Sequence, residues 1–309
     1  MRDILSDNAD ALKFCRESLG FILRDMAQAL KYESATPLVD IDTYVLGGDS
    51  AGGILALLGG HMLSPLPTAI IQSCCVTDML EYHPTPPACY PPSGKFSDDV
   101  LHELMKERDV SKAAIAAPYL SEIPPPLGMG RLPRATLDIV WGPSLASHDG
   151  PQGPEADYTE EEILWTARQN DLANVALRDS LTIPTVFRRE KFSSEEEYVA
   201  EVMSMSPLHL LGPPGSRATR TAATYPPTFI MHGTEDAGVP IHHALRFVGR
   251  LRELRRPVAW RYVEGKGHAF DIWIGPGSPG WDIIHEGVEF VDKRVREKKN
   301  GTDKVVARL

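Results

Sequence analysis

The sequence predicts an α/β protein with a mainly parallel sheet flanked by helices. Short apolar runs of strand length alternate with amphipathic stretches of helical length in both the first and the last third of the chain. Consecutive parallel strands need a helical crossover, and such crossovers are right-handed. With 309 residues the chain can bury one large core or two small ones. Functional residues are therefore expected on loops at the carboxyl ends of the strands.

The first part of the chain predicts two helices and two strands. Apolar residues recur at steps of three and four through the first helix, and Pro37 lies in the connector that follows it. A glycine-dense corner joins the first strand to the second helix. In chain order the predicted elements are a helix over 8–31, a strand over 43–46, a helix over 51–63 and a strand over 68–76.

Residues 81–205 differ in character from the rest of the chain. Prolines cluster around 84–92 and 124–126, and helices are expected over about 98–110, 159–178 and 194–204. Two of these helices begin with a capping box, one formed by Thr159 and Glu162 and the other by Ser194 and Glu197. The excess of acidic residues in 151–200 is interpreted as a solvated helical face. The pattern predicts a helical insertion, of the type that often forms a lid, within a single domain spanning 1–309.

The last part of the chain returns to alternating strands and helices. The predicted elements are a strand over 227–231, a helix over 241–254, a strand over 257–263 and a final helix over 281–299. The apolar stripe expected on the final helix consists of Trp281, Ile284, Val288, Val291 and Val295.

Composition excludes several classes of partner. The net charge of −10 argues against nucleic acid or an anionic membrane, and no apolar run reaches membrane-spanning length. The first residues lack the apolar core of a signal peptide, which favours a cytoplasmic protein. Cys15, Cys74, Cys75 and Cys89 show no C-x-x-C spacing, so buried free thiols are expected rather than disulfides or a metal site.

The sequence from Gly48 to Gly52 matches the pattern G-x-S-x-G. With a strand before it and a helix after it, this pattern places a serine hydroxyl, here that of Ser50, at a sharp and strained turn above a sheet. The flanking positions must be small where neighbouring chain passes close. The start of the helix directs backbone N–H groups at a developing oxyanion, and the N–H of Ala51 is the predicted donor.

Two further residues follow predicted strands and complete a proton-transfer set. Asp236 lies on the loop after the strand over 227–231, and His268 lies on the loop after the strand over 257–263. His268 would take the proton of Ser50 and return it to the leaving group, while Asp236 would fix the imidazole tautomer. Glu235 is the alternative acid. Of the other histidines, His232 is predicted to be structural, His61 to lie at a helix end, and His242 and His243 to be surface residues.

The stretches 48–53, 206–208, 227–236 and 267–270 together resemble the alpha/beta-hydrolase fold. They most resemble its carboxylesterase branch related to hormone-sensitive lipase, and 232–240 also resembles the prolyl-oligopeptidase branch. The order serine, aspartate, histidine is unlike that of chymotrypsin-like proteases. The resemblance covers about 8–80 and 206–295, and by family motif Ser50 is the nucleophile, Asp236 the acid and His268 the base.

This resemblance implies hydrolysis of a carboxylic ester of a small molecule or lipid through an acyl-enzyme, with no cofactor and no metal. Two alternatives stay open: a catalytically impaired homologue that binds a ligand or partner, and a peptidase of the prolyl-oligopeptidase type.

The chain departs from the family pattern before Ser50. In the complete fold, several strands and a His-Gly-Gly-Gly loop precede the nucleophile, and that loop supplies the second oxyanion N–H. No such motif occurs upstream here. The chain is expected to be a truncated gene model, a short isoform or a degenerate hydrolase. The strand over 43–46 would then have an unpaired edge unless the insertion or a partner, such as the second subunit of a homodimer, covers it.

The C-terminal tripeptide offers an alternative address. Ala307-Arg308-Leu309 resembles the small-basic-Leu peroxisomal signal of the Ser-Lys-Leu type. A peroxisomal location is therefore the alternative to a cytoplasmic one.

Overall fold

The computed structural model describes residues 43–82, 96–106, 168, 171–172, 175–213, 220–271, 274–275, 277 and 279–306. The chain divides into two compact units. One comprises Met1–Tyr82, Ser194–Ala269 and Pro279–Leu309, and the other comprises His83–Ser193 and Phe270–Ser278. The predicted helix over 8–31, the capping box at Thr159 and the C-terminal tripeptide lie outside the described residues. The lid over 81–205 stays a prediction.

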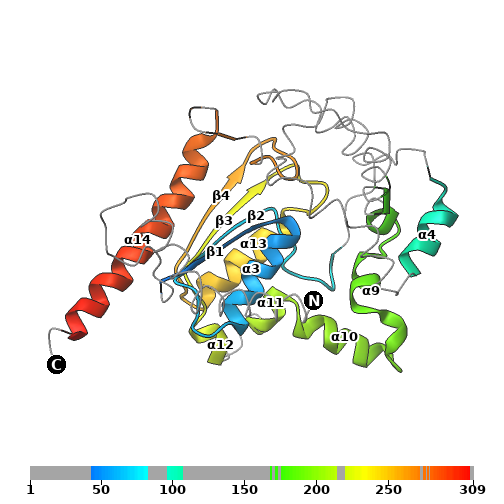
Figure 1. Cartoon of the computed structure of the whole chain (residues 1–309), viewed down its shortest axis with the longest axis horizontal. Helices are drawn as coiled ribbons and strands as arrows, with labels where there is room; N and C mark the ends of the chain where they lie inside the picture. The colour runs from blue at the N-terminus through cyan, green and yellow to red at the C-terminus, as the bar shows by residue number, and fades with distance from the viewer. Residues whose placement is uncertain are drawn as a thin grey trace, which may run out of the picture. The chain divides into compact units, whose positions relative to one another are not determined.

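Four parallel strands form the sheet of the first unit, and they lie side by side in the order of the sequence (Figure 1). They are β1 (Val45–Asp49), β2 (Ala69–Ser73), β3 (Thr228–Gly233) and β4 (Val258–Val263). The parallel arrangement confirms the prediction from alternating elements. β1 was predicted to end at Leu46, but its glycines stay extended because Gly47 to Asp49 pair with Ile71 to Ser73 of β2.

Helices cover both faces of this sheet (Figure 1). On one face α3 (Ser50–Met62) packs against β1 and β2, and α13 (His242–Glu253) packs against β3 and β4. On the other face α14 (Trp281–Val306) packs against β2 and β3. Side chains alternate along a strand, so neighbouring residues serve opposite faces. Ile70 and Ile230 join the core under α3 and α13, whereas Phe229 packs against Phe290 of α14 with ring centroids 5.9 Å apart.

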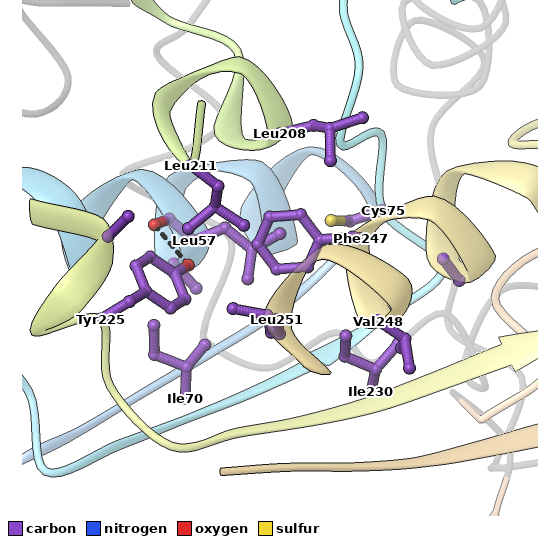
Figure 2. Packing of buried hydrophobic residues seen from close by; sticks show 13 residues of the cluster. Leu57, Ile70, Cys75, Leu208, Leu211, Tyr225, Ile230, Phe247, Val248 and Leu251 are labelled. Atoms are coloured by element: carbon purple, nitrogen blue, oxygen red, sulfur yellow. Dashed lines mark hydrogen bonds between the residues drawn. The ribbon is translucent and has the colours of Figure 1, made fainter. Parts of the chain in front are cut away.

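The main core lies between the sheet and the α3–α13 layer, closed by α11 (Pro207–Leu210) and α12 (Arg220–Ala223) (Figure 2). Tyr225 is fully buried there, and its hydroxyl donates a hydrogen bond of 2.8 Å to the carbonyl oxygen of Leu57. Its ring packs edge-on against Phe247 with centroids 6.0 Å apart. A fully buried tyrosine needs such a partner because an unpaired hydroxyl in an apolar core is costly.

One residue of the stripe predicted on α14 lies outside the buried face, while the other four are half-buried. Val288 was predicted to be buried, but 53% of its surface is exposed. Gly287 lies against the sheet instead, where an added Cβ would come within 2.7 Å of Ile71 and 3.1 Å of Phe229. The helix approaches the sheet at a glycine, and hydropathy alone does not register that contact.

The described residues of the second unit form short helices, and ion pairs link the first of them, α4 (Asp98–Lys106), to Arg178 and Asp179. The others are α9 (Thr182–Phe187) and the 3₁₀ turn Arg189–Lys191. Arg178 pairs with Asp98 at 2.8 Å and with Asp179 at 2.7 Å, and His102 contacts Asp179 at 2.9 Å. The pKa of Asp179 is lowered to about 2, chiefly by the hydrogen bond from Arg178.

Helix α10 (Glu195–Ser204) belongs to the first unit and begins as predicted. The hydroxyl of Ser194 accepts a hydrogen bond of 3.2 Å from the backbone N–H of Glu197, which confirms the predicted N-cap. In the part of the chain that the structure describes, no helix has the length and apolarity needed to span a bilayer.

Candidate active site

Ser50 lies at the turn between β1 and α3. Its φ of 50° is in the left-handed region that residues other than glycine rarely adopt. As the first residue of α3 it lies where backbone N–H groups have no partner within the helix. Ala51, whose N–H is the predicted oxyanion donor, belongs to this first turn and is an exposed residue.

The glycines around Ser50 are not equivalent. A Cβ on Gly48 would lie 2.2 Å from the carbonyl oxygen of Gly52, and a Cβ on Gly53 would lie 2.6 Å from the Cβ of Cys75. A Cβ on Gly52 would meet nothing within 4 Å. The close approach predicted for the motif is therefore made at Gly48 and Gly53, and the second glycine of G-x-S-x-G has open space.

The loops after β3 and β4 are packed against each other. A Cβ on Gly233 would lie 2.2 Å from the carbonyl oxygen of Lys266, so only glycine permits this approach. The N–H of Glu235 donates to that same carbonyl at 2.9 Å. This contact brings the loop that bears Asp236 against the loop that bears His268.

The structure brings together the three residues that were predicted separately from the sequence. His268 lies within hydrogen-bonding distance of both Ser50 and Asp236. Nε2 of His268 is 2.9 Å from Oγ of Ser50, and Nδ1 of His268 is 2.8 Å from Oδ2 of Asp236. With the Nδ1–H donating to the carboxylate, Nε2 can accept the serine proton. Glu235, the alternative acid, is exposed.

The environment keeps Asp236 ionised. Its side chain is fully buried and that of His268 is 19% exposed. Burial opposes ionisation of Asp236, but hydrogen bonds from His232, His268 and the N–H of Val239 outweigh it and lower the pKa to about 2. A buried carboxylate of this type holds an imidazole in one tautomer and stabilises its cation.

His232 approaches the same oxygen of this carboxylate as His268 does. It is fully buried in β3, its Nε2 donates to the carbonyl oxygen of Val239 at 2.7 Å, and the same nitrogen is 3.4 Å from Oδ2 of Asp236. The prediction that His232 is structural agrees with its burial, but its contact with Asp236 was not anticipated. The signal was present in the sequence, since His232 precedes Asp236 by four positions at the same strand end.

Of two other histidines, one differs from expectation and the other agrees with it. His243 was predicted to lie at the surface but is fully buried, because its Nδ1 accepts the N–H of Asp78 at 3.3 Å and its carbonyl accepts the hydroxyl of Thr77 at 2.8 Å. These hydrogen bonds connect the start of α13 to the segment that follows β2. His61 does lie at the end of α3, and its ring packs against Tyr225 with centroids 4.5 Å apart.

Comparison with known proteins gives partial matches. Residues 170–297 match the model of the Prolyl oligopeptidase family, a range that contains Asp236 and His268 but not Ser50. The esterase LipC of Mycobacterium tuberculosis is 40% identical over 63 residues, which is 20% of this chain and 15% of LipC. The non-reducing polyketide synthase Preu6 of Preussia isomera is 36% identical over 91 residues, 29% of this chain and 4% of that protein. The matches thus span a small part of these relatives.

Solved structures also match. Carboxyl esterase 2 of Tuber melanosporum is 18% identical, with a TM-score of 0.36 over 82% of this chain and 55% of that one. Dipeptidyl peptidase 4 of Porphyromonas gingivalis is 12% identical, with a TM-score of 0.39 over 87% of this chain and 22% of that one.

The class of fold follows from the sheet, its helices and the family model. A parallel sheet covered by helices on both faces, with a serine turn after one strand, an aspartate loop after another and a histidine loop after the next, defines an alpha/beta-hydrolase-type fold. The predicted fold class is confirmed. The branch related to hormone-sensitive lipase and the missing oxyanion loop stay predictions.

Proposed function

We propose that the protein is a serine hydrolase that cleaves a carboxylic ester through an acyl-enzyme. The observation that carries this proposal is the continuous chain of contacts from Ser50 through His268 to Asp236, with separations of 2.9 Å and 2.8 Å. The strained backbone of Ser50 supports it, since such strain is concentrated at functional sites.

Each residue of the chain has a defined step. His268 takes the proton of Ser50 as the serine oxygen attacks the ester carbonyl, and the carbonyl π electrons move to the oxygen. Asp236 stabilises the imidazolium that forms, and the N–H of Ala51 at the start of α3 faces the developing oxyanion. The imidazolium then protonates the departing alcohol. Water repeats the sequence on the acyl-enzyme and regenerates the serine.

The ester is preferred over a peptide because of the esterase relatives. LipC and the probable carboxylic ester hydrolase LipM, both from Mycobacterium tuberculosis, match short segments of this chain. The second candidate, a peptidase of the prolyl-oligopeptidase type, is favoured by the family model over residues 170–297. Comparing rates on p-nitrophenyl acyl esters and on proline-containing peptide anilides separates these two.

The nucleophile is tested with a fluorophosphonate probe. Wild type should be labelled covalently and Ser50→Ala should not, and ester hydrolysis should fall by about 10⁴-fold or more in that variant. Equal labelling of the two proteins would refute Ser50 as nucleophile. No labelling of wild type would favour the third candidate, a hydrolase homologue that binds without catalysis.

A further inference from the structure

Cys74 lies beside the Asp236–His268 contact. It follows β2 directly, at the edge of the sheet where the site residues gather, and it is fully buried. Its φ of 50° is a second case of left-handed backbone in a residue other than glycine. Its thiol is not in a disulfide, and Oγ of Ser73 is 3.5 Å from its sulfur.

Three atoms of ligating type converge there. One atom each from Cys74, Asp236 and His268 lie within 4.8 Å of one another. We propose that these three residues bind a thiophilic divalent cation such as Zn²⁺, and that the bound metal holds the enzyme inactive. The inhibitory half of this proposal rests on the hydrolase function proposed above, whereas the binding half does not.

The ligand set suits such an ion. Thiolate, imidazole and carboxylate are the usual protein ligands of Zn²⁺, at about 2.0–2.3 Å from the metal. Tetrahedral geometry at these bond lengths separates ligand atoms by roughly 3.6 Å. Three atoms already within 4.8 Å of one another need to shift by only about 1 Å to reach such separations. The side chain of His268 is 19% exposed, so this ligand is in contact with solvent.

Charge balance favours a divalent ion over a monovalent one. The cation takes a lone pair from the Cys74 sulfur as the thiol releases its proton to solvent, and takes further lone pairs from the Asp236 carboxylate and the neutral imidazole. Two anionic ligands neutralise the 2+ charge. Neutralisation matters because both Cys74 and Asp236 are buried, where an unbalanced charge is costly.

Metal binding and catalysis would exclude each other. In the active arrangement His268 donates from Nδ1 to Asp236 and accepts at Nε2 from Ser50. A metal on Nε2 occupies the lone pair that takes the serine proton. A metal on Nδ1 forces the ring proton to Nε2, which then donates and cannot accept. With either nitrogen ligated, Ser50 loses its base.

The binding test uses Co²⁺, which adopts tetrahedral thiolate sites and absorbs light through a thiolate-to-metal transition. Titrating the full chain with Co²⁺ should produce this band, and added Zn²⁺ should abolish it. Cys74→Ala should lose the band, and Cys74→Ser, which preserves the side-chain shape, should weaken metal binding by at least about 10-fold. Cys75→Ala is the matched control, because Cys75 is equally buried but packs in the main core.

The inhibition test measures fluorophosphonate labelling at increasing Zn²⁺, each variant being compared with its own metal-free labelling. Zn²⁺ should suppress labelling of wild type and of Cys75→Ala, a chelator should restore it, and Cys74→Ala should need at least about 10-fold more Zn²⁺. Absence of the Co²⁺ band in wild type, or its persistence in Cys74→Ala, would overturn the metal site. If the fluorophosphonate did not label wild type even without metal, only the hydrolase proposal would be contradicted. The Co²⁺ absorption band would still decide whether the metal site exists.

Discussion

At the scale of single residues, the carboxylate of Asp236 contacts more groups than the sequence predicts, since only its contact with His268 was expected. Its Oδ1 accepts the N–H of Val239 at 2.7 Å, and its Oδ2 lies 2.8 Å from His268 and 3.4 Å from His232. His232 also donates a hydrogen bond to the carbonyl oxygen of Val239. One buried imidazole thus braces both the carboxylate and the loop that presents it.

His232 is therefore predicted to act on the rate through Asp236. In His232→Phe the ring remains but its N–H is lost, and kcat/KM should fall by roughly 10- to 100-fold, the range typical of residues that orient a site ligand. His232→Gln retains an N–H donor and should recover part of the loss. Steady-state kinetics on an ester, alongside thermal melting, provide the measurement.

The control for this prediction is the exposed neighbour of the acid. Glu235→Gln should leave kcat/KM within about 2-fold of wild type, since its side chain faces solvent. If the Phe and Gln variants of His232 were equally slow at equal stability, the N–H of His232 would have no role in positioning Asp236.

At the scale of elements, the serine turn depends on two close backbone approaches rather than on the whole glycine pattern. The sequence motif marks Gly48 and Gly52, but the structure places close contacts at Gly48 and Gly53. Gly53 allows α3 to pass within reach of Cys75 at the end of β2. Cys75, the neighbour that constrains Gly53, lies outside the motif, so the motif alone could not show that Gly53 is constrained.

Alanine substitutions at these three glycines are predicted to have very different effects on the stability of the fold. Gly52→Ala has open space and lies in a helix, so it should be neutral or stabilise the fold by up to about 1 kcal/mol. Gly48→Ala must displace the carbonyl of Gly52, and Gly53→Ala must displace Cys75, so each should destabilise by about 1–3 kcal/mol or more. Urea unfolding and ester hydrolysis measure both effects.

The contrast within this set decides the interpretation. If Gly52→Ala lost as much stability as Gly53→Ala, the helix would lie nearer to its neighbours than described. Greater loss of activity in Gly48→Ala than in Gly53→Ala would show that the turn at Ser50, rather than helix packing, sets the geometry of the nucleophile.

At the scale of the whole molecule, the parallel sheet was predicted from the sequence and is confirmed, because strands that alternate with helices along the chain form parallel sheets. Ser50, Asp236 and His268 lie close together where strand ends gather, while their catalytic roles stay a prediction. Contacts between side chains distant in sequence did not follow. His243 was predicted at the surface because helix starts are usually exposed, yet Thr77 and Asp78 bind it from the end of β2. Cys74 was predicted as a buried thiol, but its neighbours Asp236 and His268 depend on the register of three strands.

The buried histidines make a prediction about the stability of the molecule in acid. Burial lowers the pKa of His61 to about 4. Burial, followed by the charge of His242, lowers that of His243 to about 3, although Asp78 opposes the shift. In the unfolded chain a histidine has a pKa near 6.5, so below that pH the unfolded state binds more protons and the folded state loses stability.

Each histidine should therefore cost up to about 1.4 kcal/mol per pH unit as the pH falls from about 6.5 toward about 4. The pKa of Asp236 is also lowered, from its ordinary value near 4 to about 2, so its contribution is complete above about pH 4 and is lost as the pH falls from about 4 to about 2. Between about pH 6.5 and pH 4, the change in unfolding free energy with pH therefore reports the histidines without a contribution from Asp236.

Urea unfolding at pH values spaced through this interval measures the slope. His61→Phe, which preserves the ring against Tyr225, should flatten it by about one proton, and His243→Asn should do the same. Tyr225→Phe is the control: it removes the hydrogen bond to Leu57 and should lower stability by about 1 kcal/mol. Burial raises the pKa of Tyr225 well above its usual value, so this variant should leave the slope unchanged. A wild-type slope in His61→Phe would mean that His61 is protonated in the folded protein, which the burial of both of its ring nitrogens argues against.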